Sequence, residues 1–452
     1  MRRSFFGLVT ILAACATPTA QAPASPAPAA RPLDPPAVTE GDVTEAHLGG
    51  MTVLVKRLPT AELVTAQLYV RGGALNWTQA NAGVEKLAFS VAAAGGTQSL
   101  DKSAFARRLA GLGADVNAET TRDWSMVQGK GPLAASTALL GLVADVFLHP
   151  ALPASEVEVA RRQQLILIQR QQENPDGRLS ALLDEVRFKG HPYEVRPEGT
   201  AATVKALTPE ALKAHLEGLR ETSRLVLVVV GNVDPAEVQA QAKALFGGLP
   251  RGAFATKVPP APVIAASSLV TEARPLPTNY LKGVFNGPAA GTTDYAAGFA
   301  LQPLLWERLF YEVRTKRNLS YAPGYVWDLS GAGTYGGLSV TAVDPDTTWK
   351  VMVQVLQRLK DEAVPAEELA GAKAESRTSM LTRQETTDGQ ASALGGGLLL
   401  TGDWRFRARL AEQVQAVKAE DIQAYARKYF GKLQVVLLGD PVKLSPSVAT
   451  TL

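Results

Sequence analysis

The stretch Leu225-Val226-Leu227-Val228-Val229-Val230-Gly231 is the part of this 452-residue sequence that decides the fold. Six apolar, mostly β-branched residues that end at a glycine predict a β-strand. A second apolar run, 433–438, ends in the same way at Gly439-Asp440, 208 residues after Gly231. Gly72 and Gly287 are separated by a similar distance, 215 residues. The two offsets predict a duplicated unit of about 200 residues.

Short strand-like runs alternate with longer helical runs on both sides of this stretch. The predicted strands are 51–56, 63–70, a pair within 114–130, 225–230, 280–285 and 433–438. The predicted helices are 83–94, 103–112, 139–147, 155–172, 209–219, 295–313, 348–362, 366–382 and 419–429. This order predicts an α+β fold of two tandem homologous units, each an antiparallel sheet packed by helices on one face. We expect an N-terminal domain over 42–255, a Pro-rich linker over 256–268 and a C-terminal domain over 269–452.

Composition excludes several classes of function. The chain has 46 basic and 43 acidic residues, a formal net charge of +3, and 46% hydrophobic residues. This balance is typical of a globular protein and argues against a nucleic-acid surface. A single cysteine excludes an intramolecular disulfide and a thiolate zinc cluster. Any imidazole chemistry depends on four histidines, His47, His149, His191 and His215.

The amino-terminal sequence is typical of an export signal and not of a folded domain. Two arginines precede a short apolar run, so residues 1–14 predict a signal peptide that is too brief to span a bilayer. The string Leu12-Ala13-Ala14-Cys15 resembles the bacterial lipoprotein cleavage box, which implies acylation of Cys15. The alternative is that Cys15 is only a small residue of the signal. Residues 15–41, rich in proline and alanine, predict an extended tether. Ala16, not aspartate, follows the cysteine; by resemblance to Gram-negative lipoprotein sorting, this implies a periplasmic body anchored by lipid to the outer membrane.

Several local strings occur in one order along the chain. They are Gly83-Val84, Gly95-Gly96-Thr97, 112–118, Glu173-Asn174-Pro175, His191-Pro192 with Gly199-Thr200, and 228–234. Together with the tandem units, they make residues 42–445 similar to the insulinase/pitrilysin family of zinc peptidases, the inverzincins. The resemblance implies a two-domain peptidase body.

Active members of that family carry H-x-x-E-H on the first buried helix. Two histidines four residues apart bind one Zn²⁺, and the glutamate activates the attacking water. The matching positions here are Lys86, Phe89 and Ser90, and the family's third ligand, a glutamate, falls on Leu167. All four are degenerate metal-site positions, so we expect no metal in this chain. We hypothesise that the Lys86 ammonium replaces the ion in holding the local structure; the alternative is a solvated lysine.

The second half carries residues that the resemblance links to catalysis in trans. The string 311–321 is similar to the family segment in which an arginine and a tyrosine seven residues later reach the opposing domain's zinc site. Arg314 and Tyr321 have this spacing. A guanidinium and a phenol can donate hydrogen bonds to a substrate carbonyl or oxyanion. The alternative is a surface cation at a helix end and a core aromatic.

The resemblance also implies substrate binding as an added strand beside Asn117 and Ala118, for which an ordinary turn-and-strand role is the alternative. We therefore expect a non-catalytic subunit of a heterodimeric zinc metallopeptidase, with no activity alone. The expected partner carries H-x-x-E-H and the zinc, the expected substrate is a peptide or unfolded protein, and no nucleic acid is involved. The competing hypothesis is a peptide- or protein-binding scaffold lipoprotein without a role in proteolysis. A stand-alone hydrolase of unrelated chemistry is a third hypothesis.

Overall fold

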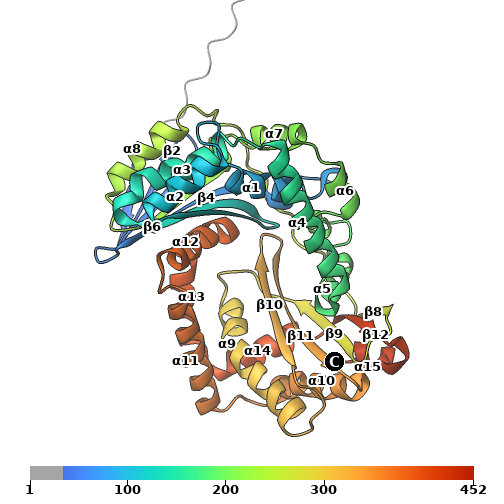
Figure 1. Cartoon of the computed structure of the whole chain (residues 1–452). Coiled ribbons are helices and arrows are strands. Elements are labelled where there is room, and N and C mark those ends of the chain that lie inside the picture. The colour runs from blue at the N-terminus through green and yellow to red at the C-terminus, as the bar shows by residue number, and fades with distance from the viewer. Residues whose placement is uncertain (1–33) are drawn as a thin grey trace, which may run out of the picture. The chain divides into compact units, whose positions relative to one another are not determined.

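The computed structural model describes residues 34–452. The predicted signal peptide, Cys15 and most of the predicted tether lie outside the described residues. The described part of the chain contains two sheets with their helices (Figure 1). Among residues 34–452, no helix is both long enough and apolar enough to cross a membrane.

The N-terminal half forms the larger sheet. Its strands are β1 (Val38–Glu40), β2 (Val43–Leu48), β3 (Met51–Arg57), β4 (Leu63–Arg71), β5 (Asp115–Thr120), β6 (Trp124–Pro132) and β7 (Leu225–Gly231). Their order is β1-β2-β3-β7-β4-β6-β5, and only the β3–β7 pairing is parallel. The helices are α1 (Val84–Ala94), α2 (Lys102–Leu112), α3 (Ser136–Leu148), α4 (Ala154–Glu173), α5 (Pro175–Arg187), α6 (Ala201–Ala206), α7 (Pro209–Gly218) and α8 (Pro235–Phe246).

The C-terminal half forms the smaller sheet. Its strands are β8 (Ser268–Ala273), β9 (Asn279–Asn286), β10 (Gly324–Ser330), β11 (Gly333–Ala342) and β12 (Gln434–Gly439). The helices are α9 (Thr293–Leu309), α10 (Pro345–Asp361), α11 (Ala366–Thr382), α12 (Thr387–Thr401), α13 (Phe406–Ala416), α14 (Ala419–Tyr429) and α15 (Pro446–Thr450). A π-helical turn, Phe310–Thr315, continues α9, so the helix predicted over 295–313 divides into two parts.

The strand orders confirm the predicted duplication. The sequence β3-β7-β4-β6-β5 in one sheet corresponds to β8-β12-β9-β11-β10 in the other. In the N-terminal half the last strand, β7, pairs in parallel with β3 and antiparallel with β4. In the C-terminal half the last strand, β12, pairs in parallel with β8 and antiparallel with β9. The α+β class with two homologous units is therefore as expected. Each sheet is antiparallel except for this one pairing.

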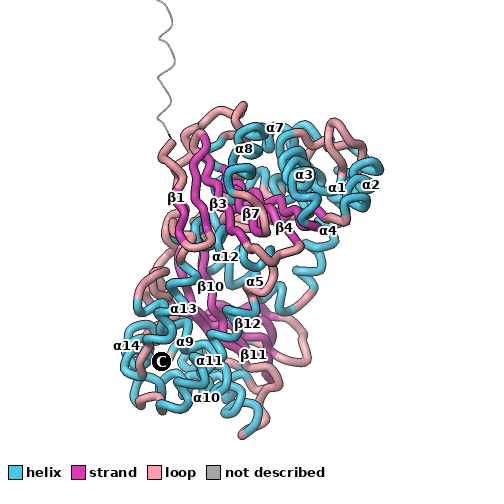
Figure 2. Tube along the Cα trace, turned by 90° about the vertical axis from the view of Figure 1, so that its left-hand side faces the viewer, coloured by secondary structure: helices cyan, strands magenta, loops and turns pink. Residues whose placement is uncertain are grey.

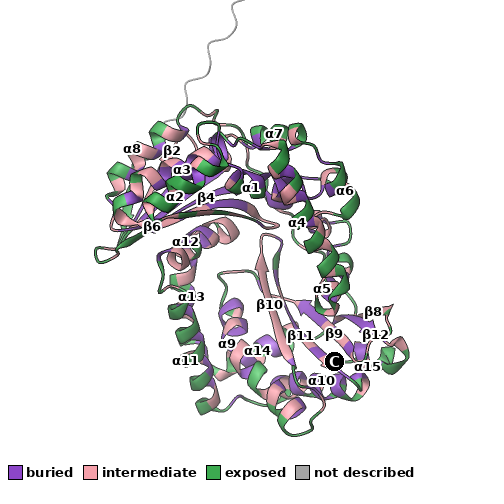
Figure 3. Ribbon diagram, viewed as in Figure 1, coloured by how far each residue is buried: buried purple, intermediate pink, exposed green. Residues whose placement is uncertain are grey.

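The structure adds a layer that the sequence did not predict. Leu227 and Val229 of β7 face the helices of their own half, whereas the alternate residues Val226, Val228 and Val230 pack against α12 of the other half. The same alternation occurs in β12, where Val436 and Leu438 pack with α5. Helices α5 and α12 thus lie between the two sheets (Figure 2). Burial on both faces explains why the stretch 225–230 is apolar without alternation, and Figure 3 shows the central strands as buried.

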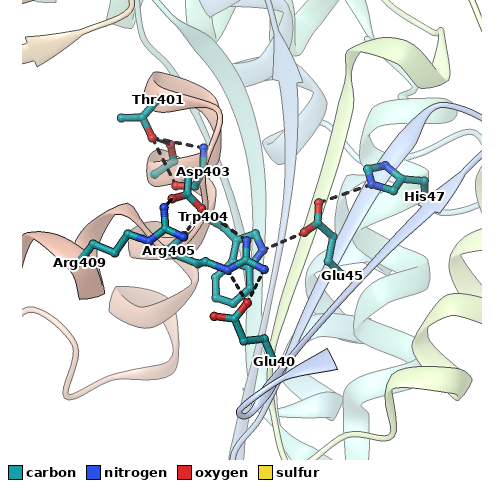
Figure 4. Close-up of polar contacts among 9 residues, drawn as sticks. Glu40, Glu45, His47, Thr401, Asp403, Trp404, Arg405 and Arg409 are labelled. Atoms are coloured by element: carbon teal, nitrogen blue, oxygen red, sulfur yellow. Dashed lines mark hydrogen bonds and ion pairs between the residues drawn. The ribbon is translucent and has the colours of Figure 1, made fainter. Parts of the chain in front are cut away.

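One predicted boundary is wrong. The tether predicted over 15–41 includes β1, which pairs with β2 through a tight turn at Gly41, whose φ is +61°. Strand β1 is also fixed by the other half, because Arg405 donates a hydrogen bond to Glu40 at 2.6 Å (Figure 4). The neighbouring Trp404 Nε1 donates to Glu45 Oε2 at 2.9 Å. These long-range contacts have no local sequence signal.

Candidate functional site

Three of the four degenerate metal-site positions lie on helix α1, and the local sequence explains why this helix begins and packs where it does. Gly83 precedes it with φ +93°, a conformation that favours glycine, and a Cβ there would lie 2.7 Å from a Val204 methyl. Leu87 and Ala88 are fully buried in the core of the N-terminal half. The helix is therefore fixed against the sheet. Of the positions that differ from the family motif, Phe89 belongs to this core, whereas Lys86 and Ser90 lie outside it.

The four positions do not combine into a metal site. Phe89 is buried and stacks on Phe147, with ring centroids 6.2 Å apart. Ser90 is exposed, and Leu167 on α4 is 38% exposed. An ammonium, a phenyl ring, a lone hydroxyl and an alkyl chain do not form a zinc donor set. No group of three His, Cys, Asp or Glu residues within 34–452 has metal-binding geometry either. The residues present at this site therefore do not fit zinc.

Lys86 does not extend freely into solvent. Its Nζ lies 3.8 Å from Glu198 Oε1, and its side chain is 25% exposed. Glu198 belongs to the segment before α6, and its carbonyl accepts a hydrogen bond of 2.8 Å from Gln164 of α4. The ammonium thus lies where α1 meets this segment. That position is compatible with the hypothesis that its charge holds the local structure, which stays a prediction.

The residue next to Lys86 forms a buried polar cluster that sequence analysis missed. The Glu85 side chain has 0% exposure, and its Oε2 lies 2.9 Å from Nε2 of His215 on α7. Ser125 of β6 donates to Glu85 Oε1 at 2.6 Å, and Asn76 Nδ2 lies 3.4 Å from the same oxygen. The cluster ties α1 to α7 and to the sheet. Because 130 residues separate Glu85 from His215, no spacing rule could have paired them.

Arg314 and Tyr321 lie side by side at the surface. The Arg314 Cζ atom is 3.8 Å from the centroid of the Tyr321 ring and 4.7 Å from that of Phe310. Tyr321 is 78% exposed, so the alternative interpretation as a core aromatic is wrong. Among residues 34–452, the Arg314 guanidinium has no ion pair. The Arg314 guanidinium therefore stacks on a tyrosine ring that is open to solvent.

An ion cluster supports the π-helical turn that carries Arg314. Glu312 is buried, and Arg358 of α10 lies 3.0 Å from one of its carboxylate oxygens. Lys316 lies 3.5 Å away, and Arg317 also pairs with this carboxylate. Burial alone would raise the pKa of Glu312, but hydrogen bonds from Arg317 and Arg358 outweigh it and lower the pKa to about 2. The turn is thus pinned to α10 by a carboxylate that stays charged at neutral pH.

Asn117 and Ala118 lie on β5, the last strand of the larger sheet. Within the described residues β5 pairs only with β6, so one edge of its main chain is free. Asn117 is exposed and Ala118 is partly buried. An added strand needs such an edge, so the geometry permits the predicted peptide contact. The structure does not bring this edge together with Arg314 and Tyr321, which belong to the other half.

Comparison with known proteins agrees with this architecture. Residues 52–200 match the family model "Insulinase (Peptidase family M16)", and residues 206–376 match "Peptidase M16 inactive domain". The chain therefore belongs to the insulinase family of peptidases, peptidase family M16. It is a family member whose H-x-x-E-H positions hold other residues.

Relatives and solved structures cover most of the chain. An uncharacterized zinc protease of Rickettsia felis is 24% identical over 397 residues, 85% of this chain and 94% of that protein. The mitochondrial-processing peptidase subunit beta of Saccharomyces cerevisiae is 22% identical over 408 residues, 83% of this chain and 86% of that protein. The solved peptidase M16 inactive domain from Pseudomonas fluorescens is 22% identical with a TM-score of 0.79, covering 89% of this chain and 99% of the other.

Proposed function

We propose that this chain is the non-catalytic subunit of a heterodimeric zinc metallopeptidase. The observation that carries the proposal is the stacking of the partly buried Arg314 on the exposed Tyr321 ring. The Arg314 guanidinium has no ion-pair partner among the described residues of its own chain. A phenol buried in the core would serve packing, whereas the exposed Tyr321 and the unpaired Arg314 beside it are available to another chain. The unsuitable donor set on α1 adds support, because zinc then belongs to a partner that carries H-x-x-E-H.

The contribution of this subunit to the reaction follows from its donors. In peptide hydrolysis the carbonyl oxygen gains negative charge as water attacks the carbon. The Arg314 guanidinium and the Tyr321 hydroxyl donate hydrogen bonds to that oxygen, and both orient the carbonyl beforehand. Stacking on the Tyr321 ring restricts the arginine, so less conformational entropy is lost when the contact forms. The zinc and the attacking water are supplied by the partner.

The other predicted features complete the proposal. Asn117 and Ala118 contact the substrate main chain along the free edge of β5. Cys15 carries the lipid that holds the body in the periplasm, at the outer membrane. Replacing it by Cys15→Ser should release the chain from the membrane fraction.

The deciding experiment reconstitutes the two chains and measures cleavage of a quenched fluorescent peptide. We expect activity only from the complex, and a fall in kcat of about 10²-fold for Arg314→Ala. Tyr321→Phe, which removes only the hydroxyl, should also reduce kcat. Tyr311→Phe is the matched control, because Tyr311 is 54% exposed on the same turn and is expected to leave kcat unchanged.

Two results would contradict the proposal. Unchanged kcat/KM in both Arg314→Ala and Tyr321→Phe, within a complex that still forms, would remove their assigned roles. Stoichiometric zinc bound by the isolated chain would show that it is not the non-catalytic partner. Peptide binding without any H-x-x-E-H partner would favour the scaffold function instead.

A further inference from the structure

A large cleft lies within the C-terminal half, away from the positions discussed above. Its volume is about 720 Å³, which is in the range of small-molecule sites. Helices α9, α11, α12 and α13 and strand β10 surround it, and Figure 1 shows α11–α13 opposite α9 and β10. Neither the predicted substrate strand nor the Arg314–Tyr321 pair lines it.

Two arginines, one exposed and one partly buried, line this cleft without a counter-ion among the described residues. Arg383 at the end of α11 and Arg407 on α13 both line it, and neither forms an ion pair with a residue of 34–452. Arg407 is partly buried, and burial lowers its pKa; the Tyr295 phenol opposes this shift, while the nearby Arg383 adds to it. A desolvated cation beside a like charge is costly unless an anion compensates it.

The acidic residues at the cleft do not supply that compensation. Glu375 and Asp328 line the cleft, but neither lies within ion-pair distance of Arg383 or Arg407. The charges that act on Asp328 are Asp123, Arg122 and Asp184, all from the N-terminal half. The cationic end of the cleft therefore remains uncompensated within the described chain.

One side of the cleft, formed by α9 and β10, is lined by aromatic residues. Trp327 and Tyr295 pack edge to face with centroids 5.4 Å apart, and Phe299 and Trp306 continue the wall along α9. Gly298 makes this possible, because a Cβ there would lie 2.6 Å from the Trp327 ring. Trp306, 48% exposed at the rim, stacks on Phe310 at 5.1 Å. Flat apolar groups gain by packing on such a surface.

We propose that this cleft binds a carboxylate carried on an aromatic or branched apolar body. The carboxylate pairs with Arg407 and Arg383, and the apolar body packs on the aromatic wall formed by Trp327, Phe299 and Trp306. The ligand is a free organic acid or the apolar C-terminal residue of a peptide; the two share this chemistry. The site does not depend on zinc, on a partner subunit or on peptide cleavage.

The test titrates the full chain alone with 3-phenylpropionate and with its uncharged analogue, 3-phenylpropionamide, by calorimetry and by tryptophan fluorescence. We expect saturable binding of the acid, at least tenfold tighter than that of the amide, with a change in fluorescence from Trp306 and Trp327. Acetate, which lacks the ring, should bind at least tenfold more weakly than the phenyl acid. A further titration uses an acetylated peptide that ends in phenylalanine, together with its C-terminal amide. Tighter binding of the peptide acid than of 3-phenylpropionate would identify the ligand as a peptide C-terminus rather than a free organic acid.

Variants locate the binding. Arg407→Gln should weaken binding of 3-phenylpropionate at least tenfold, and Arg383→Gln should also weaken it. Arg409→Gln is the control on the same helix, because Arg409 is exposed and pairs with Asp403 instead. Equal affinity for acid and amide, no saturable binding of either, or unchanged affinity in both cleft variants would overturn the proposal. If Arg407→Gln does not fold, Arg383→Gln and the acid–amide comparison on the unaltered chain still decide it.

Discussion

Replacing His215 by alanine should destabilise this protein strongly. Glu85 is fully buried, and the His215 imidazole is the partner of one of its carboxylate oxygens at 2.9 Å. Removing the ring leaves Ser125 and a long contact from Asn76, both to the other oxygen. Breaking a buried pair by deleting one partner typically costs about 3–5 kcal/mol. Total stabilities are about 5–15 kcal/mol, so His215→Ala should remove a large part of the stability.

The assay is urea denaturation followed by circular dichroism at pH 7, with the midpoint and slope fitted for each variant. His149→Ala is the matched control: this imidazole is 55% exposed and contacts Asp145 one helical turn away, so the loss should stay below about 0.5 kcal/mol. A double variant with Glu85→Gln should lose less than the sum of the single losses, because the two residues interact directly. A loss below about 1 kcal/mol for His215→Ala, or strict additivity, would refute the reasoning.

Three further substitutions, one of them a control, test the contact between the halves. A Cβ at Gly395 would lie 2.5 Å from the Tyr69 ring, so Gly395→Ala should lower the free energy of unfolding by about 1–3 kcal/mol. Gly396 is the control: its Cβ would meet no atom within 4 Å, so Gly396→Ala should raise the free energy of unfolding by up to about 1 kcal/mol. Equal shifts of the melting temperature in the two variants would contradict the packing argument. Burial and the nearby Asp123 raise the pKa of Asp328 to about 6 from an ordinary 3.8. The stability that its protonated form provides is therefore complete below about pH 4 and lost as pH rises through 6. Asp328→Asn should stabilise the protein by up to about 3 kcal/mol at pH 8 and little at pH 4, and a pH-independent effect in urea titrations would exclude this cause.

The sequence predicts elements well where the apolar pattern is strong and local. The runs 225–230 and 433–438 are strands β7 and β12, and helices such as α11 and α14 occupy their predicted ranges. Helix α12 was not predicted, because it contains three consecutive glycines and packs against strands of the other half. Strands β10 and β11 were missed as well. All residues of β10 are only partly buried, so it shows no alternation of apolar and polar positions.

The candidate site likewise contains some residues that the sequence predicts and others that it does not. The positions Lys86, Phe89 and Ser90, and the pair Arg314 and Tyr321, follow from fixed spacings within one segment, which a sequence displays directly. The Glu85–His215 pair and the Arg383–Arg407 cleft join residues from different helices. Their proximity depends on how the helices pack, which no local pattern encodes.

The reciprocal placement of α5 and α12 gives the molecule the character of an internal dimer. Each half lends one helix to the other and so hides its partner's second apolar surface. A single half produced alone would expose that surface and should aggregate. A proteolytic cut within 252–266, where no regular element connects the halves, should by contrast leave both fragments associated. The arrangement is that of a domain-swapped dimer, in which each protomer gives one helix to the other, contained here within a single chain.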